Sequence, residues 1–342
     1  MSKGPTISDV ATLAGLSKGA VSRYLNNKLV LPTETAARLE AAIQTLGFRR
    51  NHFAQRLSRG TSETIGLIVP EISDQFFAEL AEGAELEAAS ANYGLILGIG
   101  RNDVSREIDF LRWLDTHMVD GLLFVSNRPD DGQLRDHLNR YRNIVILDED
   151  IPGSHASKVF CDNVQGALYG VRHLISTGHR RIAHVSGPSA LMSAGERLSG
   201  YRQALEEANL SFDPARVLNG LYSRDYGRQA AVALSAMHPR PDAVFAGSDY
   251  IAIGLIEGFL DLGLTVPGDL SILGFDDIAP ADMVTPRLTT IRQNAQTMGR
   301  EGVRQLLATM RHPARPAMEI RTPIALVRRG SVRHRRGQNL PI

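Results

Sequence analysis

Residues 6–26 read TISDVATLAGLSKGAVSRYLN, and this stretch decides the fold of the N-terminal part of the chain. Thr6 and Asp9 have the spacing of a capping box at the start of a helix. Gly15 permits a sharp turn, and Ser17 is placed to cap a second helix that runs through Leu25. The stretch therefore predicts a helix-turn-helix unit.

A third helix is expected to complete this unit. Thr33 is placed to cap it, the helical pattern runs to about Leu46, and Gly47 stops it. Apolar residues at helical spacing predict a small core shared by the three helices, made by Val10, Ala11, Leu13, Ala14, Ala20, Val21, Leu25, Ala37, Leu39, Ile43 and Leu46.

The second helix leaves polar residues facing outward, and such a helix fits the major groove of DNA. Lys18, in its first turn, can donate to guanine O6 and N7, whereas Gly19 offers only its backbone and a close approach. Ser22 and Arg23 follow one turn later and suit a phosphate group or a further base.

The charge of the chain is distributed unevenly. Residues 1–60 contain nine Lys and Arg but only three acids, so they carry a formal charge of +6. The whole chain carries +1, and the remainder therefore carries −5. A basic segment joined to an acidic body is typical of a nucleic-acid module fused to a small-molecule domain.

Length and composition indicate a cytoplasmic protein of two or three domains. The 342 residues are 43% hydrophobic and 22% charged, which is ordinary for a globular protein. A lone cysteine, Cys161, suits a reducing compartment. We expect no signal peptide and no membrane span, because no apolar run approaches about 18 residues.

From Thr64 onward, apolar runs alternate with helical stretches. Short β-branched runs between helices predict parallel sheets covered on both faces. The pattern places helices at 77–91 and 197–208, and strands at 65–69, 95–99, 121–125, 144–147, 182–185, 243–246 and 272–274. Ligands of such sheets bind beyond the carboxyl ends of the strands, so the residues that follow each strand are the candidate ligand-binding residues.

Taken whole, residues 6–26 resemble the N-terminal segment of the lactose-repressor (LacI) family. The resemblance extends along nearly the whole chain, to about Gly330. It is carried by an ordered series of motifs: Leu46-Gly-Phe48, Asn51, Ala54-Gln-Arg-Leu57, Ile65-Gly-Leu-Ile-Val-Pro70, Phe76-Phe77, Val119-Asp-Gly121, Asp162-Asn163, Gly178-His-Arg-Arg-Ile182, Arg197-Leu-Ser-Gly-Tyr201, Gly274-Phe-Asp-Asp277 and Leu288-Thr-Thr-Ile291.

The resemblance implies an N-terminal all-α helix-turn-helix domain plus an α/β two-lobed effector domain of the type I periplasmic-binding-protein kind. The expected boundaries are 1–50 for the DNA-binding domain, 51–61 for a hinge helix and linker, and 62–330 for the effector-binding and dimerisation domain. Lobe 1 would comprise about 62–160 and 292–322, and lobe 2 about 161–291 and 323–330. Residues 331–342 would form a disordered basic tail.

The resemblance also implies how DNA is bound. A hinge helix near 51–59 would fold only when paired with its dimer mate on DNA, and Leu57 would wedge into the minor groove at the operator centre, where the contacts made by bent DNA offset the cost of unstacking. Arg50 stands where the family commonly has proline. The candidate DNA-binding residues are Lys18, Gly19, Ser22, Arg23, Asn26, Asn51, Leu57 and Arg59.

For the effector, the resemblance places Arg197 and Asp276 in the cleft, where both can bind neighbouring hydroxyl groups of a polyol. Asp74 and Gln75 replace the usual Asn-Pro, and an added carboxylate would favour a neutral ligand over a phosphorylated one. The candidate effector-binding residues are Asp74, Phe76, Phe77, Asp148, Arg197, Tyr222, Ser248, Asp276 and Gln293.

Rival functions are less well supported by the sequence. An enzyme would need a cofactor motif or a catalytic set, but 94–100 lacks the third glycine of a dinucleotide fingerprint, and no paired metal spacing or base–nucleophile pair emerges. We therefore expect neither a cofactor nor a metal. A secreted sugar-binding protein would need an export signal and has no use for residues 1–60.

Within the regulator class, a sugar or sugar derivative is the expected effector and a purine the alternative. The segment 328–342 has no heptad repeat, so we expect a homodimer on a pseudo-palindromic operator rather than a coiled-coil tetramer. The sequence does not decide between a repressor and an activator. It also leaves open whether the effector releases or promotes DNA binding.

Overall fold

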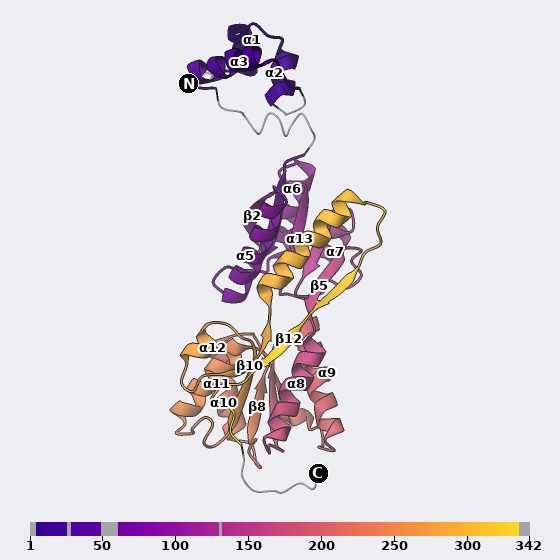
Figure 1. The fold of residues 1–342 in the computed structure, drawn as a ribbon. Helices are drawn as coiled ribbons and strands as arrows, with labels where there is room; N and C mark the ends of the chain where they lie inside the picture. The colour runs from indigo at the N-terminus through magenta and orange to yellow at the C-terminus, as the bar shows by residue number, and fades with distance from the viewer. Residues whose placement is uncertain (1–4, 26–28, 49–60, 130–131, 335–342) are drawn as a thin grey trace. The chain divides into compact units, whose positions relative to one another are not determined.

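The computed structural model describes residues 5–25, 29–48, 61–129 and 132–334. The chain divides into two compact units, Met1–Thr61 and Ser62–Ile342 (Figure 1). Each unit has its own buried core, as the sequence pattern predicts.

The first unit contains three helices in its described part: α1 (Ile7–Ala14), α2 (Lys18–Leu25) and α3 (Thr33–Leu46). The predicted capping box of α1 is present, since the Thr6 backbone N–H donates to Asp9 Oδ2 at 2.7 Å and the Thr6 side chain accepts from the Asp9 N–H. Gly15 adopts φ +65°, and Ser17 Oγ accepts from the Ala20 N–H at 3.1 Å. The predicted helix-turn-helix is confirmed.

Three details of this unit differ from the prediction. Thr33 does not cap α3: the N-cap is Pro32, which makes no side-chain cap hydrogen bond, and Thr33 is already the first helical residue. Leu13 and Ala37 are exposed rather than part of the core. A helix buries only the stripe that packs on its neighbours, and both residues lie outside that stripe. The core consists of Val10, Ala11, Ala14, Val21, Leu39 and Ala42, with partly buried neighbours.

The second unit contains two six-stranded sheets. The first has the order β11-β5-β4-β3-β1-β2, and the second β12-β10-β9-β8-β6-β7. All neighbours are parallel except β10 and β12. The strands of the first sheet are β1 (Thr64–Val69), β2 (Gly94–Ile99), β3 (Gly121–Phe124), β4 (Ile144–Leu147), β5 (Ser157–Cys161) and β11 (Glu319–Thr322). Those of the second are β6 (Ile182–Ser186), β7 (Val217–Asn219), β8 (Ala243–Ala246), β9 (Ser271–Asp276), β10 (Thr289–Gln293) and β12 (Ile324–Val327).

Helices flank both sheets (Figure 1). With the first sheet lie α5 (Gln75–Ser90), α6 (Val104–Asp115), α7 (Gln133–Leu138) and α13 (Ala295–Arg311). With the second lie α8 (Asn163–Ser176), α9 (Met192–Glu207), η1 (Pro214–Arg216), α10 (Arg224–Ser235), α11 (Asp249–Asp261) and α12 (Pro280–Met283). We call the two halves lobe 1 and lobe 2.

The seven predicted strands all form, but β5, β7, β10, β11 and β12 were not predicted. The sequence of β10, TTIRQ, is polar, yet Thr289, Thr290 and Gln293 are buried by the strands on either side. Burial of these side chains depends on neighbours that are distant in sequence, and no local pattern reveals it.

The chain passes between the lobes three times: from β5 to α8, from β10 to α13, and from β11 to β12 through Pro323. The second passage lies slightly later than expected, because Arg292 and Gln293 still pair with β12 in lobe 2. The C-terminal tail was expected to begin at residue 331, but residue 331 still belongs to the fold. Ser331 is buried, and its Oγ accepts from the Thr289 N–H at 2.8 Å and donates to the Ile272 carbonyl at 2.6 Å.

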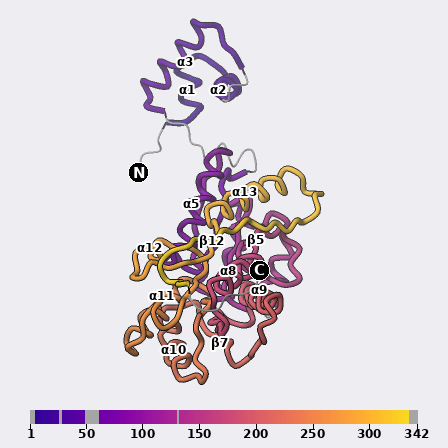
Figure 2. The backbone as a smooth tube through the Cα atoms, turned by 60° about the horizontal axis from the view of Figure 1, so that its bottom comes forward, coloured from indigo at the N-terminus to yellow at the C-terminus, as the bar shows by residue number. Residues whose placement is uncertain are grey.

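Helices α5 and α13 lie side by side on lobe 1, as Figures 1 and 2 both show. Glycines make this close approach possible. A Cβ on Gly299 would overlap the carbonyl oxygen of Leu80, and a Cβ on Gly83 would overlap the backbone of Gln296. A continuous cluster of buried side chains extends from these helices through β1 to β8 and β9.

We predict that Gly299→Ala lowers the free energy of unfolding by about 1–3 kcal/mol, because the added methyl group forces two packed helix backbones apart. Gly195→Ala is the matched control: Gly195 is exposed on α9, and a Cβ there meets nothing within 4 Å. This control is expected to raise stability by up to about 1 kcal/mol, since alanine favours a helix. Urea unfolding of both variants tests the prediction, and equal stabilities would contradict it.

Candidate functional site

Helix α2 presents the candidate DNA-reading surface of the first unit. Lys18, Gly19 and Arg23 are exposed, and Ser22 is half-buried. The Arg23 Nε–H donates to the Gly19 carbonyl at 3.3 Å, so this guanidinium lies along the helix toward its N-terminus. Asn26, Asn51, Leu57 and Arg59 lie outside the described residues, and their roles stay predictions.

The second unit contains a cavity between its lobes. The nine candidate effector residues all line it: Asp74, Phe76, Phe77, Asp148, Arg197, Tyr222, Ser248, Asp276 and Gln293. Most follow the carboxyl end of a strand, where parallel strands deliver their loops to one edge of each sheet. The structure thus brings together residues that are more than 200 positions apart in the sequence.

Lobe 1 contributes acidic and aromatic groups. Asp74 caps α5, and its Oδ1 accepts from the Phe76 N–H at 2.9 Å. The Phe76 and Phe77 rings meet edge to face with centroids 5.3 Å apart, and both are buried. Asp148 directly follows β4 with φ +68°, a left-handed backbone conformation that turns the chain at the cavity wall.

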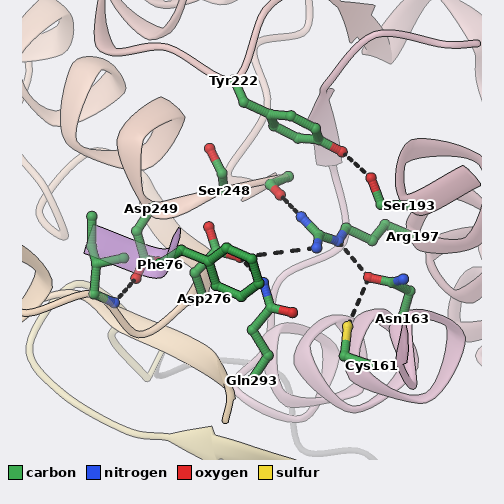
Figure 3. A network of polar contacts seen from close by, with 12 residues as sticks. Phe76, Cys161, Asn163, Ser193, Arg197, Tyr222, Ser248, Asp249, Asp276 and Gln293 are labelled. Carbon is green, nitrogen blue, oxygen red and sulfur yellow. Dashed lines mark hydrogen bonds and ion pairs between the residues drawn. The ribbon is translucent and has the colours of Figure 1, made fainter. Parts of the chain in front are cut away.

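Lobe 2 contributes Arg197, which is only 4% exposed. Figure 3 shows its guanidinium among the polar side chains of the site. Its Nε–H donates to Asn163 Oδ1 at 2.8 Å, and its Nη1 donates to the Gly247 carbonyl. The guanidinium carbon lies 3.9 Å from the centroid of the Phe275 ring. Its Nη2 is 3.9 Å from Asp276 Oδ1, so the expected arginine–aspartate pair is close but is not hydrogen-bonded.

The remaining lobe 2 residues are held by their neighbours. Gln293 Nε2 donates to Asp276 Oδ1 at 2.7 Å, which orients both side chains at the cavity wall. The Tyr222 and Ser193 hydroxyls are 2.9 Å apart (Figure 3). Ser248 caps α11 by accepting from the Ile251 N–H at 3.2 Å.

Four further residues line the cavity and are not among the sequence candidates: Asn127, Glu149, Ser193 and Tyr250. Asn127 follows β3, so the strand-end rule applied to that strand would have found it. Ser193 precedes Arg197 by one helical turn and shares its face of α9. No local signal marks Tyr250 as a cavity residue.

Burial of several carboxyl groups changes their acidity. Desolvation raises the pKa of Asp276 to about 7. Burial, followed by repulsion from Glu149, raises the pKa of Asp148 well above its ordinary value. Burial also raises the pKa of Glu149 and of Asp74. The cavity therefore holds protons at pH values where exposed carboxyl groups are ionised.

Other candidate chemistry is not supported in the described part of the chain. His179 is buried, and its Nδ1 lies 3.0 Å from the Leu174 carbonyl oxygen, which indicates a structural role. No group of three or more His, Cys, Asp or Glu side chains among the described residues is placed to hold a metal ion. None of the described helices combines the length and apolar character needed to cross a bilayer.

We predict that the stability contributed by Asp276 is lost as pH rises from about 4 to about 7. Asp276 has a folded-state pKa raised above its unfolded value, so the folded state keeps a proton that the unfolded state releases in this window. Asp276→Asn removes this contribution and, compared with the native chain, should raise Tm at pH 7 relative to Tm at pH 5 by about 2–4 °C. Asp261→Asn, at the exposed end of α11, is the control. Parallel Tm profiles for Asp276→Asn and the native chain would refute the assignment.

Comparison with known proteins places the chain in a family. Residues 6–51 match the bacterial regulatory proteins of the lacI family, and residues 171–332 match a periplasmic binding protein-like domain. The chain is 33% identical over 304 residues to the HTH-type transcriptional repressor PurR of Vibrio campbellii, covering 88% of this chain and 91% of that protein.

Two solved structures are similar along nearly the whole chain. The lac repressor dimer bound to operator and the anti-inducer ONPF has 25% identity and a TM-score of 0.86, covering 97% of this chain and all of that chain. The transcriptional regulator CelR in its cellobiose complex has 30% identity and a TM-score of 0.73, covering 96% of this chain and 99% of that chain. With its helix-turn-helix unit and two-sheet α/β domain, the chain belongs to the lacI family of bacterial regulatory proteins and is a DNA-binding transcriptional repressor of that family.

Proposed function

We propose that this repressor binds a hydroxyl-rich small molecule, a sugar or sugar derivative, between its lobes, and that binding changes its affinity for operator DNA. The observation that carries the proposal is the convergence of the candidate side chains on one cavity with walls from both lobes. Asp74 and Asp148 come from lobe 1, and Arg197 and Asp276 from lobe 2.

The chemistry of the cavity supports a polyol. Carboxylate, guanidinium and amide groups make directional, charge-assisted hydrogen bonds with hydroxyl groups. Phe76 and Tyr222 add ring surfaces on which the apolar face of a sugar ring can pack. The carboxyl groups would repel a phosphorylated compound. A purine is the competing class, and the relative named PurR keeps it in the test.

Control of DNA binding follows from contacts with both lobes. A ligand that touches both lobes stabilises only those lobe arrangements that keep its contacts, and so shifts the equilibrium between arrangements. In the proposed homodimer, movement of lobe 1 changes the spacing of the two chain segments that lead to the helix-turn-helix units. The coupling free energy is typically about 1–3 kcal/mol and acts equally in both directions. The protein would act in the cytoplasm and need no cofactor.

We predict that Lys18→Ala weakens binding to the operator more than binding to random DNA, because Lys18 reads a base edge from the first turn of α2. The operator sequence is first selected from a pool of random duplexes. On that operator, the expected loss of binding free energy is about 1–3 kcal/mol. Arg38→Ala changes an exposed charge on α3 and is the control, expected to affect both DNAs alike. Equal losses on both DNAs for Lys18→Ala would rule out base reading.

We predict that a sugar or sugar derivative stabilises the protein thermally and changes operator affinity by roughly 5- to 150-fold. A thermal-shift screen of monosaccharides, disaccharides, sugar alcohols, sugar phosphates and purines identifies the class, and an operator titration with the hit measures the coupling. Asp276→Asn should weaken binding of the compound found in the screen, whereas Asp261→Asn should not. Stabilisation by purines alone would reject the sugar class, and a hit without effect on operator binding would reject the coupling.

A further inference from the structure

The cavity between the lobes has more hydrogen-bond acceptors than donors available to a ligand. The carboxylate of Asp148 is the clearest case. Asp148 is 9% exposed and lines the cavity, and its side chain has no hydrogen bond or ion pair with the described residues. Its oxygens are therefore open to the cavity, where a ligand can supply the donors that a carboxylate in such a partly desolvated place normally has.

Gln293 shows the same deficit. Its amide N–H donates to Asp276, but its Oε1 is buried and has no partner among the described residues. Gln293 is 6% exposed and lines the same cavity. Two acceptors from different lobes therefore lack donors at the place where a ligand would bind.

The single cation of the described lining does not correct this imbalance. Four carboxyl groups, those of Asp74, Asp148, Glu149 and Asp276, stand against the guanidinium of Arg197. Two edges of that guanidinium are already occupied by Asn163 and Gly247. Its positive charge is thus held on the lobe 2 wall by two neutral acceptors, with Asp276 Oδ1 3.9 Å from its Nη2.

We propose that the effector carries a protonated primary amine, that the amine binds against Asp148, and that the ligand is an amino sugar or a similar hydroxylated amine. This inference rests on the proposed function and specifies its ligand. An ammonium group brings three donors and a positive charge, which are what Asp148 lacks. Hydroxyl groups on the same molecule fit Asp276, Gln293 and the Arg197 Nη2, and the Phe76 ring offers a face that a cation favours.

The acidity of the site agrees with this assignment. Burial and repulsion between neighbouring carboxyl groups raise the pKa of Asp148. An ammonium placed against it removes both penalties, because the charge is compensated inside the same low-dielectric space. A neutral sugar can bring donors but cannot bring that charge.

Matched ligand pairs test the proposal. Glucosamine, galactosamine and mannosamine are titrated calorimetrically into the native protein at pH 7, beside glucose, galactose, mannose and the three N-acetylated amino sugars. We expect at least one amine to bind about tenfold or more tighter than both its hydroxyl parent and its uncharged N-acetyl form. Parents or N-acetyl forms that bind as tightly as the amines would overturn the inference and leave the proposed function standing.

Two variants test whether the Asp148 carboxylate is responsible for the preference for the amine. Asp148→Asn keeps the size of the side chain, and asparagine tolerates the left-handed conformation found there, so the fold is expected to persist. It should weaken binding of the amine on the order of tenfold to a hundredfold and weaken binding of the parent sugar much less, so that the preference for the amine is lost. Asp150→Asn is the control, because Asp150 pairs with Lys158 at 2.5 Å and does not line the cavity. An equal effect of both variants would overturn the role of Asp148, and binding by none of the sugars or amines would overturn the proposed sugar class as well.

Discussion

Arg197 places a positive charge in the interior of the α/β domain, and the groups around it are arranged to compensate that charge. Asn163 and the Gly247 carbonyl accept its N–H groups, and the Phe275 ring lies against its face. Burying an ion costs several kcal/mol unless such partners are present. The hydrogen bonds of Arg197 therefore hold α9 against the start of α8 and the end of β8. Asn163 also donates to Glu196 at 3.0 Å. The cleft is thereby tied to the passage between the lobes.

The hydrogen bonds around Glu196 connect one lobe with the other. Glu196, on α9 of lobe 2, also accepts from the Arg321 guanidinium at 2.7 Å, and Arg321 belongs to β11 of lobe 1. A chain of hydrogen bonds therefore runs from the cavity to the strand that precedes Pro323. Arg197 forms part of both the cavity wall and this chain. A ligand that shifts Arg197 acts on the passage through direct contacts, which gives the proposed coupling between effector and DNA a physical route.

The acidic wall opposite Arg197 has a different consequence. Asp148 has no donor within the described structure, and burial raises the pKa values of Asp148 and of its neighbour Glu149. A cavity wall of this kind costs stability, as is common where a site must discriminate between ligands. The proposed ligand would supply the missing donors. Selectivity would then depend on charge as well as on shape, because a molecule that leaves the Asp148 carboxylate unpaired would lose affinity.

The sequence by itself determined the elements and the places where chemistry gathers. The capping box at Thr6, the turn at Gly15 and the β-branched runs are local signals. The strand-end rule, together with the resemblance to the LacI family, selected the nine candidate effector residues that line one cavity. Only the tertiary structure decided which groups these side chains pair with. Arg197 turned out to be paired with Asn163 and Gly247 more closely than with Asp276, and β10 proved buried despite its polar sequence. Such choices depend on packing between residues far apart in the chain, where small differences in distance and burial decide which hydrogen bonds form.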